Sequence, residues 1–307
     1  MKNQDGFTLV EMMVAVVIAG IVMASVMYTF TSQQKSYAVQ EQVAMMQQNL
    51  RASMYYISSE VQMAGYRISS DINTYSMDWD PTSGGAEVLS PLIYGRNNDN
   101  DGGGNDVRDG TDLIMIVKAS EDEWRTLGAG EGNSGTSTYL SLSDLDFNGD
   151  GDDDLDTGNR SYAILVKSDL SRAEFIKVNS IGPSGTSKQV TIEPGFELTE
   201  TYSGVSDIIA RADIIIYRIN EDGVPALERR NLGRDNGFQV LGEGISDMQI
   251  QYILNDGSSI SGVSTVDQAK VREVDITLTG QTNIPGAGLK ERTLRSCIKV
   301  RNFGTSM

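Results

Sequence analysis

The chain has 307 residues and carries 42 acidic against 25 basic side chains, which gives a formal net charge of −17. This balance disfavours nucleic-acid binding, which needs a basic surface. The absence of histidine excludes Ser-His-Asp and Cys-His catalysis and His-ligated zinc. The single cysteine, Cys297, excludes an intramolecular disulfide. Because no nucleophile–base pair can be proposed, we expect no enzymatic activity.

The most informative segment is the N-terminus. A polar leader, residues 1–6, precedes an apolar run over residues 7–30 that contains one charge, Glu11. As a helix this run of about 24 residues is ~36 Å long, enough to cross a bilayer. A secretory signal peptide begins with basic residues and has a shorter apolar stretch, whereas here Asp5 offsets Lys2. A charge inside such a segment costs at least ~2.5 kcal/mol unless it meets a partner, so Glu11 indicates a function.

The residues at the junction, GFTLVE at positions 6–11, resemble the type IV prepilin signature. The resemblance implies that a prepilin peptidase cleaves between Gly6 and Phe7 and methylates the new amine of Phe7. It also implies that the helix stays in the inner membrane until the subunit enters a filament. There the carboxylate of Glu11 would pair with the Phe7 amine of a neighbouring subunit, so that two buried charges compensate each other. An ordinary membrane anchor that shares these letters is the alternative.

The helical pattern continues beyond the apolar run, without a proline before Pro81. Apolar residues then recur at spacings of three and four, which predicts an amphipathic helix. This stripe is Val39, Val43, Met46, Leu50, Met54, Ile57, Val61 and Ala64. We expect a single spine helix from about Thr8 to Ala64, with a membrane or filament-core half over 7–30 and an amphipathic half over 31–65. The alternative is a membrane helix followed by a separate coiled coil.

The remainder of the chain, residues 66–307, predicts an extracytoplasmic β-rich globular domain. Residues 69–110 are polar and rich in turn formers, and we expect an irregular surface loop there. Short apolar runs separated by turns then predict strands. These are Thr111–Lys118, Ser161–Lys167, Ala173–Val178, Gln189–Ile192, Asp213–Ile219, Ala226–Asn231, Gly244–Leu254, Val271–Thr279 and Thr293–Asn302. The fold class is therefore α+β, with an antiparallel sheet on the spine helix, as the prepilin resemblance also implies. Cys297 lies in an alternating run and is expected to be a buried filler.

Several short motifs resemble the PilW group of minor type IV pilins, and their order along the chain carries the resemblance. They are MAGY at 63–66, LERR at 227–230, LGEGI and MQIQY within 241–252, VREVDITL at 271–278 and KVRN at 299–302. The resemblance implies a minor pilin that helps prime pilus assembly and sits at or near the tip. Its partners would be other minor pilins, the major pilin and the inner-membrane assembly platform. The protein would be a single-pass inner-membrane protein before assembly and lie on the cell surface afterwards. J-type minor pseudopilins of type II secretion share this layout and are an alternative.

One loop has the pattern of a calcium site. Oxygen-bearing residues alternate around Gly151 in a calcium-loop spacing, and the candidate ligands are Asp146, Asn148, Asp150, Asp152, Asp154 and Asp156. No helices are expected beside the loop, so it is not an EF-hand, and a solvated acidic turn is the alternative. A calcium site would favour a different function, a calcium-dependent tip adhesion module.

Two other segments carry weaker signals. Residues 97–106 (NNDNDGGGND) are a poorer version of the same calcium pattern. The glycine-rich residues 128–132 neither follow a clear strand nor open a helix, as a phosphate-binding loop would. We therefore expect a flexible loop at 128–132.

Overall fold

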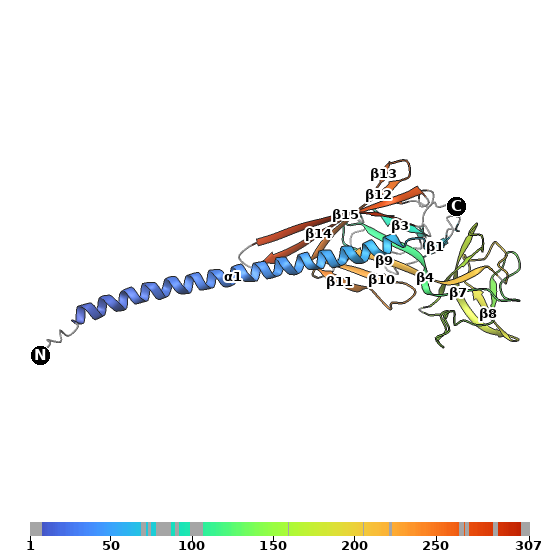
Figure 1. Ribbon diagram of the computed structural model, residues 1–307, viewed down its shortest axis with the longest axis horizontal. Coiled ribbons are helices and arrows are strands. Elements are labelled where there is room, and N and C mark those ends of the chain that lie inside the picture. The colour runs from blue at the N-terminus through green and yellow to red at the C-terminus, as the bar shows by residue number, and fades with distance from the viewer. Residues whose placement is uncertain are drawn as a thin grey trace.

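The computed structural model describes residues 8–68, 72, 75–77, 87–89, 92–98, 107–158, 160–204, 206–220, 223–263, 267, 270–284 and 288–301. It consists of one long helix and a β-rich globular part built around the C-terminal half of that helix (Figure 1). The predicted α+β class is confirmed. The elements are α1 Leu9–Gln62, β1 Tyr75–Met77, β2 Glu87–Leu89, β3 Ile93–Arg96, β4 Leu113–Thr126, β5 Tyr139–Leu142, β6 Tyr162–Val166, β7 Ala173–Ser184, β8 Ser187–Ile192, β9 Ile208–Ile219, β10 Ala226–Asn231, β11 Gln239–Glu243, β12 Ile245–Leu254, β13 Ser259–Ile260, β14 Val271–Ile284 and β15 Gly288–Lys299.

Helix α1 is continuous over 54 residues, so a separate coiled coil after the apolar run is excluded. The predicted apolar stripe is buried from Met46 to Val61, whereas Val39 and Val43 are only partly buried. Helix α1 contacts β11, β12, β14 and β15. The helix ends where Gly65 takes a positive φ of 70°, a backbone conformation that glycine adopts without steric cost.

The larger sheet has nine strands and is built around β9. One edge of β9 pairs with β4 along its length, and the other edge pairs with β10 near Ile219 and with β6 near Ile208. Strands β7, β8 and β5 continue from β6 and form the end of the molecule farthest from the N-terminus (Figure 1). Strand β9 is buried along almost its whole length, because it lies in the middle of the sheet with both faces covered.

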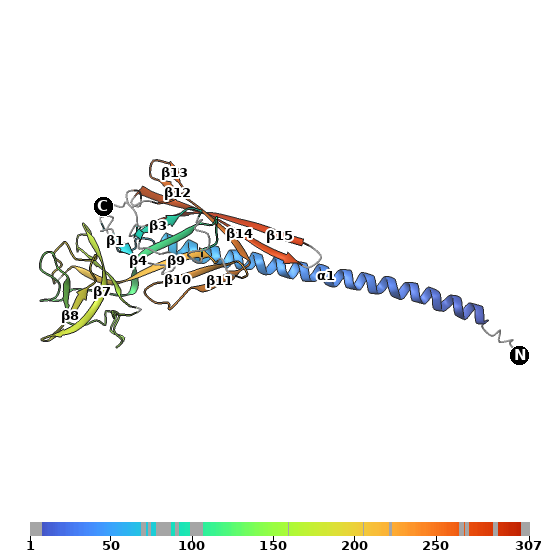
Figure 2. The ribbon, with the colours of Figure 1, turned by 180° about the vertical axis from the view of Figure 1, so that it is seen from behind.

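The smaller sheet has four strands in the order β13-β12-β14-β15, and every pairing in it is antiparallel. Strand β12 contacts β9 and β10, so the two sheets share one hydrophobic core. The long β14–β15 hairpin lies beside helix α1 and extends along it toward the N-terminus, as both ribbon views show (Figures 1 and 2). The structure thus places the helix against β12, β14 and β15 of the smaller sheet and against β11 of the larger one.

The sequence-based prediction differs from the structure in three places. Strands β1, β2 and β3 lie within residues 69–110, which were expected to be an irregular loop. Strands β5, β11 and β13 are absent from the prediction, because each has only two to five residues and a weak apolar signal. Strands β7 and β14 continue past their apolar runs into polar residues, since ladder pairing continues where burial ends. Strand β4 also continues, but its pairing with β9 is interrupted between Ala119 and Trp124 and resumes from Trp124 to Thr126.

Candidate functional site

The first turn of helix α1 is capped by its own side chains. Thr8 is the N-cap, and its hydroxyl accepts a hydrogen bond from the Glu11 amide at 3.3 Å. In return, Glu11 Oε2 accepts bonds from the Thr8 amide at 2.9 Å and from the Thr8 hydroxyl at 2.8 Å. This reciprocal capping box satisfies groups that the start of a helix otherwise leaves unpaired. The carboxylate of Glu11 therefore has a defined position at the helix start. Gly6 and Phe7, the predicted processing residues, lie outside the described residues.

The apolar segment of the helix packs against nothing else in the described part of the chain. Every residue from Leu9 to Ala38 is exposed, including large apolar side chains such as Leu9 and Phe30 at 77% and 54%. Among the described residues, this is the one helix long and apolar enough to span a membrane. The hydroxyl groups of Ser25 and Thr29 donate to carbonyl oxygens of the same helix, Ser25 to Ile21 and Thr29 to Ser25, both at 2.9 Å. They can therefore enter an apolar environment without an unpaired donor.

The globular domain begins at a fixed distance from this segment. From Leu9 to Ala38 the helix extends over 30 residues, ~45 Å at 1.5 Å per residue, before the first partly buried residue, Val39. Polar residues 31–38 cover the last ~12 Å of that length. The apolar segment is therefore separated from the sheets by about two helical turns.

The sheets hold the helix through a defined set of contacts, which we call the helix seat. It comprises residues 46–66 of the helix and the turn after it, Val117 and Ala119 of β4, Tyr217 of β9, residues 227–230 of β10, residues 241–245 around β11, and Gly280 of β14. Just beyond the C-terminal end of α1, the Gly65 amide donates to the Val117 carbonyl at 2.9 Å, and the Ala119 amide donates to the Tyr66 carbonyl at 3.1 Å. These two bonds fix the end of the helix to β4. They give the MAGY motif a structural role.

Within the seat, the carboxylate of Glu60 joins the helix to β9 and β10. Arg229 Nη2 lies 2.9 Å from Glu60 Oε1, and the Tyr217 hydroxyl donates to Glu60 Oε2 at 2.9 Å. Arg229 also lies 3.4 Å from Asp235. Burial, together with the neighbouring Glu60 carboxylate, raises the pKa of Tyr217, so the phenol stays protonated and donates. Arg229 belongs to the LERR motif, whose role the sequence did not reveal.

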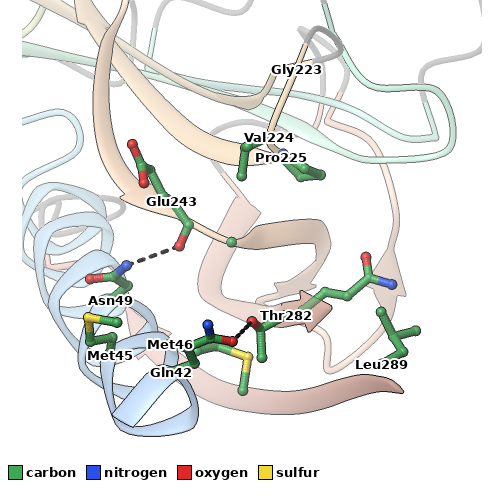
Figure 3. Close-up of a pocket in the computed structure, with 12 residues that line it drawn as sticks. Gln42, Met45, Met46, Asn49, Gly223, Val224, Pro225, Glu243, Thr282 and Leu289 are labelled. Atoms are coloured by element: carbon green, nitrogen blue, oxygen red, sulfur yellow. Dashed lines mark hydrogen bonds between the residues drawn. The ribbon is translucent and has the colours of Figure 1, made fainter. Parts of the chain in front are cut away.

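Two glycines let the helix approach the sheets closely. A Cβ on Gly280 would lie 2.8 Å from Met46 Cγ, and a Cβ on Gly242 would lie 2.6 Å from Ser53 Oγ. Gly242 belongs to the LGEGI motif. Figure 3 shows the lower part of the seat, where the Asn49 amide donates to the Glu243 carbonyl at 3.0 Å. A groove of about 640 Å³ opens there beside the helix.

The comparison with known families concerns the N-terminus. Residues 1–27 match the prokaryotic N-terminal methylation motif. The motif is joined here to an exposed apolar helix of membrane-spanning length. Together, the motif and the helix support a type IV pilin-like protein. A comparison with curated proteins gives no match.

The methylation motif suggests a structural role for the chain. The methylation motif implies processing by a prepilin peptidase and assembly with other pilins. The exposed apolar helix fits the single-pass membrane anchor typical of pilins. The helix and its seat are therefore the parts of this pilin-like protein that bear on assembly.

The acidic loop in which we predict a calcium site is held in a tight turn by hydrogen bonds from its own backbone amides. Both carboxylate oxygens of Asp146 accept amide bonds, from Gly149 at 2.6 Å and from Gly151 at 2.9 Å, and these bonds lower the pKa of Asp146. Gly151 has a φ of 97°, which permits the turn. Asp154 is buried and accepts from the Phe147 amide at 2.6 Å.

The other candidate ligands also bond locally. Asn148 and Asp150 accept from amides two residues ahead at 3.0 and 2.9 Å, and Asp156 accepts from the Arg160 amide at 2.9 Å. In the described part of the chain, no three acidic or cysteine side chains converge as metal ligands. Calcium binding would thus require exposed side chains, such as those of Asp150 and Asp152, to turn inward. Of the poorer calcium pattern at 97–106, residues 99–106 lie outside the described residues.

The glycine-rich segment at 128–132 is held by hydrogen bonds to the carboxylate of Glu131, which lies within the segment. Glu131 is buried and receives bonds from the Arg125 guanidinium, the Gly128 amide, and the amide and hydroxyl of Ser143. Burial alone would raise the pKa of Glu131, but these donors lower it to about 2. The expectation of a flexible loop is wrong here, because Glu131 holds the segment in place.

Cys297 is exposed, so the prediction of a buried filler is wrong. The sequence correctly predicts alternation along β15, but the even-numbered residues, such as the buried Ile298, point toward the core. The Cys297 thiol lies 3.3 Å from Glu273 Oε2. Partial burial and this carboxylate raise the pKa of Cys297, so the group is not an activated thiolate.

Proposed function

We propose that this protein is a minor type IV pilin of the PilW type, which helps prime pilus assembly and sits at or near the tip. In this role it joins other minor pilins in the inner membrane through its apolar helix. The complex then serves as the start of the filament, to which the major pilin is added.

The observation that carries the proposal is the exposed, capped apolar helix. Its apolar side chains are exposed and are covered by none of the residues that the structure describes, while Glu11 sits at a fixed place in the first turn. A membrane accommodates the apolar side chains but not the carboxylate. A bundle of helices from neighbouring subunits accommodates both, because a processed N-terminal amine can compensate Glu11. The arrangement therefore favours assembly into a helical bundle over permanent anchoring.

The PilW type is supported by where its motifs lie. MAGY, LERR and LGEGI are far apart in the sequence, yet each contributes a contact to the helix seat. Short motifs that meet at one structural junction have a common physical task, which is to hold the spine helix at a set position. A shared task of this kind explains why the three motifs occur together in one chain, which a chance match of each motif would not.

The test is a deletion strain complemented with the wild-type chain or with Glu11→Ala. If the proposal is right, the deletion lacks surface filaments under the electron microscope, the wild-type chain restores them and Glu11→Ala does not. Immunogold labelling of the complemented strain then marks filament ends rather than shafts.

The same strain separates the alternatives. Normal filaments with loss of protein secretion would identify a J-type minor pseudopilin of type II secretion. Normal filaments that no longer attach to surfaces would favour the calcium-dependent tip adhesion module.

A further inference from the structure

Strand β15 forms a long free edge of the smaller sheet. It pairs with β14 over its whole length and, among the described strands, with no other. Only beyond its end does a bond reach the helix, from the Arg301 amide to the Gln62 carbonyl at 3.4 Å. An edge strand of this kind presents backbone donors and acceptors that a further strand can use.

The hydrogen-bond pattern shows which residues present those groups. In an antiparallel pair, residues alternate between bonding to the partner strand and pointing away from it. The Val300 amide donates to the Arg272 carbonyl at 2.9 Å, and the register continues without a shift down the hairpin. The even-numbered residues of β15 therefore bond to β14. The backbone groups of Glu291, Thr293, Arg295, Cys297 and Lys299 point to the free edge.

The charge of this edge is opposite to that of the chain. Strand β15 contains four basic residues, Lys290, Arg292, Arg295 and Lys299, and one acidic residue, Glu291. Arg295 is bound to Asp275 at 2.9 Å, and the other three basic side chains are exposed. Pairing two copies of β15 would bring like charges together, which is unfavourable across strands. An acidic strand from another protein would meet opposite charges instead.

We propose that the free edge of β15 binds an extended, acidic segment of a different protein by β-strand addition. The backbone groups of the odd-numbered residues supply the pairing, and the basic side chains select an acidic partner and disfavour a second copy of this chain. This interaction involves neither Glu11 nor the apolar segment of α1, so it goes beyond the assembly role proposed above.

The test uses the full-length chain in detergent micelles and a dye-labelled peptide of about nine residues that alternates glutamate with valine or threonine. One control peptide has lysine in place of glutamate. A second keeps the glutamates but carries N-methyl groups on alternate backbone amides, which blocks strand pairing without changing the charge. Fluorescence anisotropy should show binding of the acidic peptide, with both controls at least about tenfold weaker.

Variants of β15 give an internal control. Thr293→Pro removes an outward amide that bonds to nothing in the sheet, so the fold should keep its melting temperature while peptide binding is lost. Thr293→Val keeps that amide and should bind as the wild type does. Leu294→Pro removes an amide that bonds to β14 and should lower the melting temperature.

Three results would overturn the proposal. Equal binding of the N-methylated peptide would show attraction by charge alone. Absence of binding by the acidic peptide would show that the edge does not accept a strand. A dimer in analytical ultracentrifugation that Thr293→Pro dissociates would show that a second copy is the occupant.

Discussion

Arg229 on β10 and Glu60 on helix α1 are 169 residues apart in the sequence, and their side chains lie 2.9 Å apart. The same carboxylate accepts the hydroxyl of Tyr217 on β9. One side chain of the helix is thus tied to two neighbouring strands of the larger sheet. The orientation of the helix over the sheet depends on this carboxylate as well as on apolar packing.

Loss of Arg229 should therefore destabilise the fold. The Arg229 and Glu60 side chains are only 22% and 16% exposed, so Arg229→Met would leave a largely buried carboxylate without its cation. We expect the free energy of unfolding to fall by about 1–3 kcal/mol. Urea denaturation of the full-length chain in detergent measures it. As a control, Asp153→Asn in the exposed Lys188–Asp153 pair should change it by less than about 0.5 kcal/mol. Equal effects of the two substitutions would contradict the role given to Arg229.

Glu131 should make stability depend on acidic pH. Its pKa falls from an ordinary 4.5 to about 2 in the folded state, so the ionised carboxylate stabilises the fold above pH 4.5. That contribution, at most about 3 kcal/mol, is lost as the pH falls from about 4.5 to about 2. The melting temperatures of the wild type and Glu131→Gln should differ at pH 6 and converge toward pH 2. A difference that stays constant over that range would contradict the prediction.

Processing should leave a defined N-terminus. The leader meets the apolar run between Gly6 and Phe7, so cleavage there should give a mature chain that begins with N-methylated Phe7. Mass spectrometry of the protein purified from membranes measures this directly. An intact Met1, or cleavage near residue 25, would contradict the pilin-like assignment.

Substitutions of Glu11 should separate its two roles. Glu11→Gln keeps an oxygen that can complete the capping box with Thr8 but removes the charge, whereas Glu11→Ala removes both. Both variants should insert into the membrane at least as well as the wild type, because a costly charge is gone. Both should also fail to co-purify with other pilins. If Glu11→Gln assembles normally, helix capping rather than charge pairing is what assembly needs.

The calcium prediction is tested by melting temperature. The loop is already closed around Asp146, and the exposed side chains of Asp150 and Asp152 bring further negative charge to the same turn. Binding to the folded state alone would stabilise by about 2.7 kcal/mol at a hundredfold excess over Kd. The full-length chain should melt at a higher temperature in calcium than in chelator, and Asp150→Ala should remove most of the difference. Equal melting temperatures would leave the segment as an acidic turn.

Local patterns predicted the helix and most of the strands, because periodic apolar residues and turn formers act over short distances. The side that β15 turns toward the core was not predictable this way. An alternating run has two equivalent faces until a partner element covers one, and Cys297 was assigned to the wrong face for that reason.

The helix seat depends on contacts that no local pattern contains. Glu60 and Arg229 each look like an ordinary surface charge in the sequence, and Gly280 looks like a weak point in a strand. Only the arrangement of the sheets shows that Arg229 and Gly280 face the helix and that Glu60 faces the sheets. The N-terminal site was easier to predict, because Glu11 stands alone in an apolar run and its signal is therefore local.

The unpacked first half of helix α1 has a mechanical consequence. If the apolar segment is held in a bundle and the globular part is pulled, tension passes along one helix and enters the sheets first near Gln42 and Asn49, which bond to Thr282 and Glu243. The β14–β15 hairpin lies along the helix, close to the direction of that pull (Figure 1). Its hydrogen bonds are therefore loaded in shear, where many must fail together, rather than opened one after another from the end of the ladder.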